Sequence, residues 1–244
     1  MKQLTLVFLF ITFCATAFAT DNNKGNVDQL QKATNVLNEI MGTPDKGIPD
    51  ELLEKAVCVG IVPSELKFAL GIGGTYGRGV LVCRKGGNGL WGAPSMFTLG
   101  GGSFGFQIGG KATDLVFVVM NPEGARKLVQ DSVKLGAEAS VAAGPVGRSA
   151  TGATDAQLHA EILSYSRSQG LFAGLSLNGS VLKQDADDNK KLYGHKVSAK
   201  EILIDGTVRS PRSARGLDNT LRKYSPKGGQ AFNGSSTAKS ARAR

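Results

Sequence analysis

The chain has 244 residues, and its hydrophobic content of 41% excludes a generally disordered protein. Glycine accounts for 33 residues, but no Gly-x-x period with abundant proline accompanies it, which excludes collagen. The formal net charge is +9, yet residues 205–244 hold nine basic and two acidic residues, so the charge belongs mainly to the C-terminal segment. The basic balance is therefore weak support for a nucleic-acid partner of the body.

The N-terminus has the three parts of an export signal. Met1-Lys2 is positive, Leu4 to Phe13 is uncharged and apolar, and Ala17-Phe18-Ala19 matches the small-x-small cleavage pattern. A membrane anchor is the alternative, but the apolar stretch from Leu4 to Ala19 is shorter than the roughly 20 residues that a spanning helix needs. We therefore predict a signal peptide over residues 1–19 and an exported protein, periplasmic or extracellular.

Export changes what the cysteines can do. Cys14 leaves with the signal peptide, so Cys58 and Cys83 remain. An oxidising compartment permits a disulfide between them. Two buried free thiols are the alternative, since both cysteines lie in apolar runs. A structural zinc site is not expected, because the paired ligand spacing is missing.

The first predicted elements are two helices and a strand. Apolar residues at helical spacing predict a helix over residues 27–41, which the Gly-Thr-Pro sequence at 42–44 ends. Pro49, followed by two acids, predicts a second short helix. The apolar run from Val59 to Val62 predicts a strand, and Pro63 is expected to end it.

A Gly-rich series of strands follows. Alternation over residues 66–72 predicts a half-buried strand, a turn is expected at 75–77, and a second strand runs over 80–84. A further turn is predicted at 85–89. Residues 96–99 lead into a glycine cluster, after which Phe104, Phe106 and Ile108 are expected to share one strand face. The continuous apolar run at 115–120 is typical of a strand that is covered on both sides.

The C-terminal half alternates helices and strands. Asn121 is predicted to cap a helix that begins at Pro122, and apolar alternation over 171–181 predicts one long strand. Residues 185–192 match a helix, and Ser198 with Glu201 forms a capping-box pattern before 199–204. The sequence thus predicts an α+β single domain over 27–224, with a curved, largely antiparallel Gly-rich sheet or partial barrel and packed helices. Residues 225–244 are expected to form a disordered basic tail.

Motifs for catalysis and metal binding are weak. Two Gly-x-Gly-x-x-Gly matches, at 87–92 and 100–105, lack the following helix that a dinucleotide site needs. His159 and His195 have no nucleophile-elbow partner and are expected to be surface or structural residues. The calcium-like run from Asp185 has lysine at the positions of the required glycine and glutamate. We predict no enzyme activity, no catalytic residue, no metal and no cofactor.

Ordered sequence blocks over about 48–204 resemble the SYLF domain, also called the DUF500 or actin-patch-type domain. The residues that carry this resemblance lie at 48–49, 73–84, 91–95, 105–110, 113–114, 140–148, 164–166, 169–174, 189, 193–194 and 201–203. The resemblance implies a lipid-binding module. Eukaryotic members are similar to phosphoinositide binders, some of them also binding actin, and they carry SH3 or FYVE domains. The predicted export indicates a bacterial single-domain member and argues against actin as a partner.

Five basic residues next to glycine-rich segments are candidates for holding an anionic lipid headgroup: Arg78, Arg84, Lys111, Arg148 and Arg167. The predicted function is thus non-enzymatic binding of anionic phospholipid, of phosphatidylinositol type in eukaryotic relatives, at an envelope membrane. Two alternatives stay open, a structural or protein-interaction envelope protein without a lipid ligand and a lipid hydrolase. The helix predicted at 27–41 is expected to pack on the domain and not to lie on a membrane.

Overall fold

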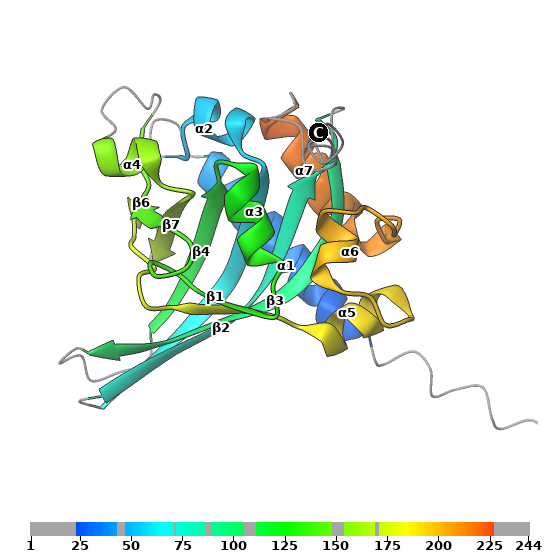
Figure 1. The fold of residues 1–244 in the computed structure, drawn as a ribbon, viewed down its shortest axis with the longest axis horizontal. Coiled ribbons are helices and arrows are strands. Elements are labelled where there is room, and N and C mark those ends of the chain that lie inside the picture. Colours follow the sequence, from blue (N-terminus) through cyan, green and yellow to red (C-terminus); the bar gives the residue numbers. More distant parts are fainter. Residues whose placement is uncertain are drawn as a thin grey trace, which may run out of the picture.

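The computed structural model describes residues 23–42, 47–70, 72–85, 89–104, 111–147, 154–168 and 171–226. It is an α+β single domain around a strongly curled, open nine-stranded sheet (Figure 1). The strand order is β5-β9-β3-β2-β1-β4-β7-β6, and β8 also pairs with β7. Every pairing is antiparallel except that of β6 with β7, so the predicted fold class is confirmed.

The three longest strands, β1, β2 and β3, form the centre of the sheet, and the bounds of all strands and helices are as follows. The strands are β1 (Cys58–Leu70), β2 (Ile72–Arg84), β3 (Trp91–Phe104), β4 (Lys111–Val119), β5 (Ser132–Lys134), β6 (Val141–Ala143), β7 (Ile162–Ser168), β8 (Leu171–Gly174) and β9 (Val181–Gln184). The helices are α1 (Lys24–Met41), α2 (Asp50–Lys55), α3 (Pro122–Leu128), α4 (Asp155–His159), α5 (Ala186–Tyr193), α6 (Ala199–Leu203) and α7 (Arg215–Tyr224), with a 3-10 turn, η1 (Arg212–Ala214).

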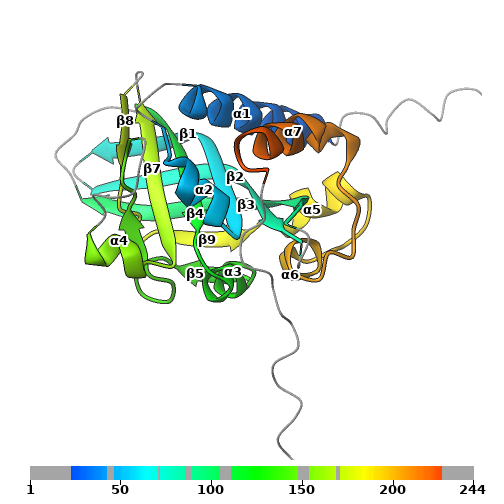
Figure 2. The same cartoon turned by 90° about the horizontal axis from the view of Figure 1, so that it is seen from above.

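Helices cover both faces of the sheet. On one face α1 and α7 lie side by side (Figure 2), and their buried side chains join those of α2 in one apolar core. On the other face α3 and α6 cover a second core. The residues of β4 alternate between the two, with Val116 and Val118 in the first core and Leu115, Phe117 and Val119 in the second. The predicted strand with two covered faces is therefore confirmed.

Several predicted helix ends are confirmed because their hydrogen bonds are local. The Asn121 side chain accepts from the backbone N–H of Gly124, and Asp185 accepts from that of Asp188. Ser198 and Glu201 form the predicted capping box at the start of α6. The helix predicted at 27–41 is α1, which begins three residues earlier, at Lys24.

The predicted strand boundaries around Pro63 were wrong. β1 continues through Pro63 to Leu70, and residues 75–77 lie inside β2 and form no turn. The register of β1 against β2 shifts between Ile61 and Leu66, where Ser64 has a φ of 54°. This bulge accommodates the proline, which a regular central strand would not.

The single strand predicted over 171–181 was also wrong. The chain forms β8 and β9 instead, separated by a turn in which the N–H of Ser180 donates to the carbonyl of Leu177. Gly179 has a φ of 83°, a left-handed conformation that favours glycine. Two helices, α4 and α7, had no predicted counterpart.

The structure decides between the two states left open for the cysteines. Cys58 and Cys83 lie directly opposite each other in the β1–β2 pairing and form a disulfide. Their Cα atoms are 4.0 Å apart, as expected for close cross-strand neighbours.

The two predicted terminal segments lie mostly outside the described residues. The signal peptide over 1–19, Phe106 and Ile108, and residues 227–244 all belong to the part that is not described. Ser225, which was predicted to open the disordered tail, is fully buried and bonded. Among the described residues, none of the helices has the length and apolar character needed to cross a membrane.

Candidate functional site

Of the five predicted headgroup residues, the structure describes the side chains of Arg78, Arg84 and Arg167, and these three have separate sets of partners. Arg78 and Arg84 lie six positions apart on β2, and Arg167 lies on β7. Lys111 opens β4 at the start of its pairing with β1. Arg148 lies outside the described residues. The three described arginines differ in burial and partners, so each is treated on its own.

Arg84 is a buried structural residue, with 4% of its surface exposed. Its Nε donates to the Ala56 carbonyl at 3.1 Å, and its Nη2 donates to the Ser225 carbonyl at 3.1 Å. The guanidinium also lies over the Trp91 ring, 4.1 Å from the ring centroid. Burial lowers its pKa to about 10, against the opposing effect of the Glu54 carboxylate, so it remains a cation at neutral pH.

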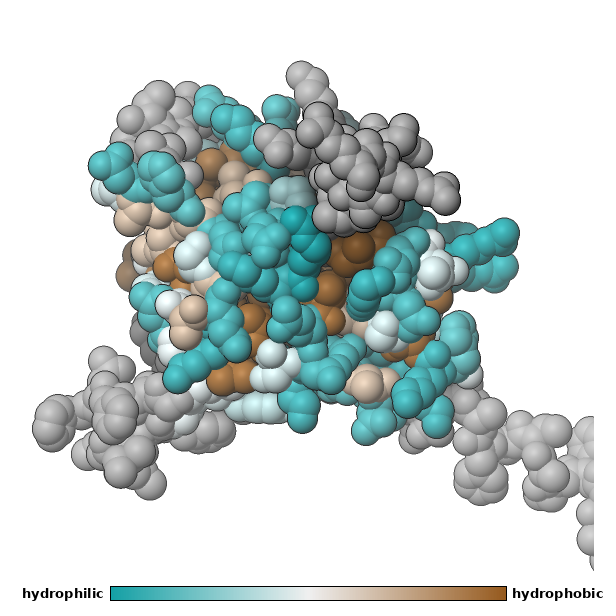
Figure 3. Space-filling model, in the orientation of Figure 1, coloured by the Kyte–Doolittle hydropathy of each residue, from teal (hydrophilic) through white to brown (hydrophobic). Residues whose placement is uncertain are grey.

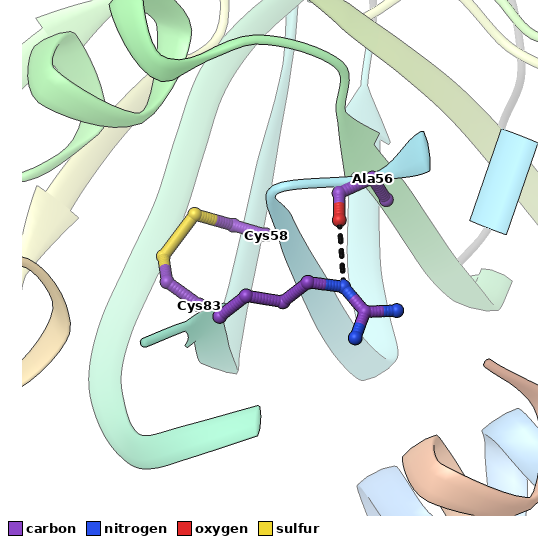
Figure 4. The surroundings of a disulfide bond; sticks show 4 residues. Ala56, Cys58 and Cys83 are labelled. Atoms are coloured by element: carbon purple, nitrogen blue, oxygen red, sulfur yellow. Dashed lines mark hydrogen bonds between the residues drawn. A yellow bond between two sulfur atoms is a disulfide. The ribbon is translucent and has the colours of Figure 1, made fainter. Parts of the chain in front are cut away.

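The surroundings of Arg84 tie three distant parts of the chain together. Figure 4 shows Ala56, whose carbonyl accepts one of its hydrogen bonds, beside the Cys58–Cys83 disulfide. The Ser225 hydroxyl donates to the Leu53 carbonyl at 2.8 Å, and the Trp91 Nε1 donates to the Ser225 carbonyl at 3.3 Å. Because its donors already serve these internal acceptors, Arg84 has little capacity left for an external phosphate.

Arg78 and Arg167 are partly exposed but have acidic partners. Arg78 pairs with Asp188, and its Nη2 also donates to the Asn26 side chain at 3.1 Å. Burial alone would raise the pKa of Asp188, but the hydrogen bond from Lys191 and the charges of Arg78 and Lys191 lower it overall. An anionic headgroup at Arg78 would therefore have to compete with this carboxylate.

Arg167 is held between two acids. Its Nη2 lies 2.7 Å from Asp114 Oδ2, and its Nη1 pairs with Glu39 of α1. Burial opposes the charge, but the hydrogen bond and charge of Asp114, together with Glu39, raise the pKa of Arg167 overall. The arrangement joins β7, β4 and α1, and we interpret it as a structural contact.

Exposed cations occur at many places on the described surface, and five of them follow one another closely in sequence near its C-terminal end. We call these five the basic stripe: Arg209, Arg212, Arg215, Arg222 and Lys223. Leu217 and Leu221 of α7 are buried against the first core, and Arg222 pairs with Asp218 at 2.9 Å. Within the described part of the chain, no ion pair is found for Arg209, Arg212 or Arg215. Sequence analysis assigned these charges to the C-terminal segment 205–244 and predicted no helix for them, although Leu217 and Leu221 at a four-residue spacing beside cations indicate an amphipathic helix.

A shallow hollow is lined by residues of β2, β3, η1 and α7, among them Val82, Pro94 and Leu217, and it encloses no space for a small-molecule ligand. The face that carries α3 and α6 is mostly polar, with apolar side chains exposed in small areas (Figure 3). The described residues also contain no group of three or more His, Cys, Asp or Glu arranged to hold a metal.

The weaker motifs have structural explanations. Gly100 lies within β3, with strand and not helix after it, and Gly92 lies near the start of that strand. His159 and His195 are exposed, and each ring lies near a backbone carbonyl of its own segment. In the calcium-like run, Asn189 is buried and its side chain accepts from the Met96 N–H at 2.7 Å. That residue therefore holds α5 against β3.

The sequence was then compared with known protein families. Residues 100–224 match a family described as "Ysc84: Las17-binding protein actin regulator". The chain belongs to the Ysc84 (SYLF) family. The resemblance drawn from the sequence blocks is thereby confirmed. Members of this Ysc84 (SYLF) family among the curated proteins also match over most of the chain.

Two relatives illustrate the extent of the match. The chain is 35% identical over 199 residues to LAS seventeen-binding protein 3 of Saccharomyces cerevisiae, covering 79% of this chain and 42% of the yeast protein. It is 33% identical over 204 residues to SH3 domain-containing YSC84-like protein 1 of Xenopus laevis, covering 81% of this chain and 60% of the frog protein. The chain thus spans about half the length of these relatives, whose names describe binding or domain content and not catalysis.

Proposed function

We propose that the protein is a non-enzymatic module that binds anionic phospholipid surfaces after export to the cell envelope. Membership in the Ysc84 (SYLF) family supports a binding role. The observation that carries the proposal is the basic stripe, in which Arg209, Arg212 and Arg215 are exposed and lack ion-pair partners among the described residues. Such cations can meet phosphate groups without first giving up an internal contact.

The position of the stripe favours a membrane surface over a small anion. Arg212 belongs to η1 and Arg215 to α7, and α7 packs along α1 through buried leucines. The backbone that carries Arg212 and Arg215 is therefore held against the first core. Each cation near an anionic bilayer contributes about 1 kcal/mol at most, and the attraction is screened beyond the Debye length. Several cations on one support add up to useful affinity.

The proposed mode of binding is contact with the membrane surface and not extraction of a lipid. The shallow hollow between β2, β3 and α7 encloses no space for an acyl chain. The lipid tails then stay in the bilayer while the headgroups meet the protein. Lys111 and Arg148 remain candidate contacts in this proposal, whereas Arg78, Arg84 and Arg167 already have internal partners.

Export is the second part of the proposal. The Cys58–Cys83 disulfide supports it, because structural disulfides persist in oxidising compartments and are rare in the cytosol. The expected location is the periplasm or cell exterior, with the protein peripheral on a membrane.

The test is vesicle co-sedimentation of the chain from residue 20 onward. We expect binding to vesicles that contain phosphatidylglycerol or phosphatidylinositol, weaker binding to pure phosphatidylcholine, and a loss of binding as salt rises. Replacing Arg209, Arg212 and Arg215 by glutamine should weaken binding to anionic vesicles by about tenfold or more. The matched control replaces Lys134 of β5, Lys183 of β9 and Lys196, which follows α5. These three are exposed, have no ion pair among the described residues, and remove the same charge.

Equal losses in both triple variants would mean that only net charge matters and that the basic stripe is not a site. Failure of the unmodified protein to bind any anionic vesicle would overturn the proposal as a whole. Breakdown of lipid during the incubation would favour a hydrolase instead.

A second candidate function, binding of a protein partner, is favoured by the names of the yeast relatives, which are described as LAS seventeen-binding proteins. For an exported protein the partner would be an envelope protein and not actin. A specific partner recovered by pull-down, together with indifference to vesicles, would select this function.

A further inference from the structure

Arg84 is a buried cation whose hydrogen-bond acceptors are all neutral. Its guanidinium donates to the carbonyls of Ala56 and Gly89 and to the carbonyl and hydroxyl oxygens of Ser225. Among the described residues no carboxylate forms an ion pair with it, and Glu54 acts on it only through longer-range charge. Buried charges are normally paired, because an unpaired ion that has lost its water is unfavourable. An anion that reached Arg84 would therefore supply the charge that its present acceptors lack.

Ser225 supplies two of these four acceptors. Its carbonyl oxygen accepts from Arg84 Nη2 at 3.1 Å, and its hydroxyl oxygen accepts from the same nitrogen. Oxygens of one phosphate group bind a guanidinium in the same way, and their charge makes those hydrogen bonds stronger. Ser225 thus occupies the place that an anion bound to Arg84 would take.

Trp91 aims a further donor at this place. The Arg84 guanidinium lies over the Trp91 ring, 4.1 Å from the ring centroid, and Trp91 Nε1 donates to the Ser225 carbonyl at 3.3 Å. Arg84 Nη2 and Trp91 Nε1 therefore converge on the same oxygen atom. A phosphate group carries several acceptor oxygens, so it can accept from both donors when Ser225 is not there.

Ser225 belongs to a short segment at the end of the described chain. It directly follows α7, and the next residue, Pro226, is exposed. Besides the donors already described, two hydrogen bonds hold Ser225: its N–H donates to the Leu221 carbonyl and its hydroxyl to the Leu53 carbonyl, both at 2.8 Å. Leu217 and Leu221 anchor α7 separately in the first core. Residues 225 and 226 can therefore move while the packing of α7 stays in place.

We infer that residues 225 and 226 form a displaceable strap over a phosphate-binding site made by Arg84 and Trp91. With the strap closed, Ser225 satisfies the converging donors. A phosphate group that enters takes the place of the two Ser225 oxygens and neutralises the buried cation. Because the ligand competes with the strap, its apparent affinity is reduced by the fraction of molecules that are open. The site is distinct from the basic stripe, and its existence does not depend on the proposed function.

Trp91 is the only tryptophan of the chain and is 4% exposed, so its fluorescence reports on the strap. The chain from residue 20 onward is titrated with inorganic phosphate at constant ionic strength, with chloride as the control anion. Emission from Trp91 and its quenching by acrylamide are recorded. For the unmodified protein we expect strong protection from acrylamide and a phosphate response only at high concentration.

The Ser225→Pro variant opens the strap. Ser225 has a φ of −146°, which proline cannot adopt, and proline lacks the N–H that donates to Leu221. We expect Trp91 to become accessible to acrylamide and the half-saturating phosphate concentration to fall by roughly a hundredfold. The milder Ser225→Ala variant removes only the hydroxyl and should lower that concentration by about tenfold. Pro226→Ala is the matched control, which keeps every hydrogen bond of Ser225 and should behave as the unmodified protein.

A second substitution in the Ser225→Pro background identifies the binding residue. Arg84→Lys keeps a cation but offers no planar fork of donors, so it should weaken phosphate binding by about tenfold. Circular dichroism on heating establishes that each variant is folded. Vesicles of phosphatidylcholine with phosphatidic acid then distinguish two sources of the phosphate group. A Trp91 response at a lower phosphate concentration on these vesicles than in free solution assigns a lipid headgroup, and the reverse order assigns a free phosphate.

Three results would overturn the strap and its site. In Ser225→Pro, Trp91 stays protected from acrylamide, or it responds equally to chloride and phosphate. In the same background, the phosphate response is unchanged by Arg84→Lys. The response is lost when Arg209, Arg212 and Arg215 are replaced by glutamine, which would make the basic stripe the binding site. Failure to bind anionic vesicles, with the Trp91 response to inorganic phosphate intact, overturns the proposed function alone.

Discussion

The two ends of the β1–β2–β3 strands differ sharply, although the same strands form both. At one end Arg84, Trp91, Ser225 and the disulfide join strands, a loop and the end of α7 in a buried network. At the other end the strands extend past the labelled helices (Figure 1), and Gly74 and Tyr76 of β2 are exposed. The comparison shows that buried packing and exposure are separated along one set of strands.

The largest loss of stability is expected when the Arg84 side chain is removed from the buried end of the strands. In the Arg84→Ala variant the Ala56 carbonyl loses its side-chain donor, and the Ser225 carbonyl keeps only the hydrogen bond from Trp91 Nε1. Hydrogen bonds to a charged group contribute about 1.5–3 kcal/mol each, so we expect the free energy of unfolding to fall by about 3 kcal/mol. Urea denaturation measures the change. Lys85→Ala, at the exposed neighbouring position, should change it by less than about 0.5 kcal/mol.

A smaller effect is expected from a comparison of two glycines of β2. A Cβ at Gly79 would lie 2.9 Å from the backbone carbonyl oxygen of Ile61 and 2.3 Å from the Phe97 ring. Among the described atoms, the nearest to a Cβ at Gly74 is 3.8 Å away. Gly79→Ala should therefore destabilise the protein by about 2 kcal/mol through overpacking. Gly74→Ala, at the exposed end of β2, should change stability by about 0.5 kcal/mol or less, in either direction.

Both changes in the free energy of unfolding are measured from the shift of the urea midpoint, with the slope of the transition unchanged. Equal destabilisation by the two alanines would contradict the contrast, since it would mean that β2 is packed as tightly at Gly74 as at Gly79.

The smallest expected effect is a pH-dependent change in the free energy of unfolding that arises from Glu161. The Glu161 carboxylate accepts from the Ser140 N–H and from Lys127 Nζ, both at 2.8 Å. Burial alone would raise the pKa of Glu161, but these partners lower it overall. Because the unfolded state then binds more protons, this contribution is complete above the ordinary carboxyl pKa and is lost as pH falls through the lowered folded value.

The stability advantage of the unmodified protein over Glu161→Gln should accordingly be constant near neutral pH and shrink below about pH 4. Urea denaturation across pH 3–7 measures it. Two curves that stay parallel to the lowest pH would show that the carboxylate adds no pH-dependent stability.

Sequence by itself determined the features that depend on neighbouring residues. Asn121 and Ser198 cap their helices through partners three residues away. The run at 115–119 consists only of apolar residues, which by itself predicted that these residues are buried. The family was also determined, because its sequence blocks keep their order along the chain. These signals survive without tertiary information because short-range hydrogen bonds and apolar periodicity act within one element.

Only the tertiary structure decided the roles of the basic residues. Asp188, the partner of Arg78, lies 110 positions away, and Ser225, the partner of Arg84, lies 141 positions away. The pairing of Cys58 with Cys83 followed from the strand register. The same register continues, after a shift near Ser64, through residues 75 and 76, where a turn was expected. No local pattern encodes these contacts, since each depends on how strands distant in sequence are aligned in space.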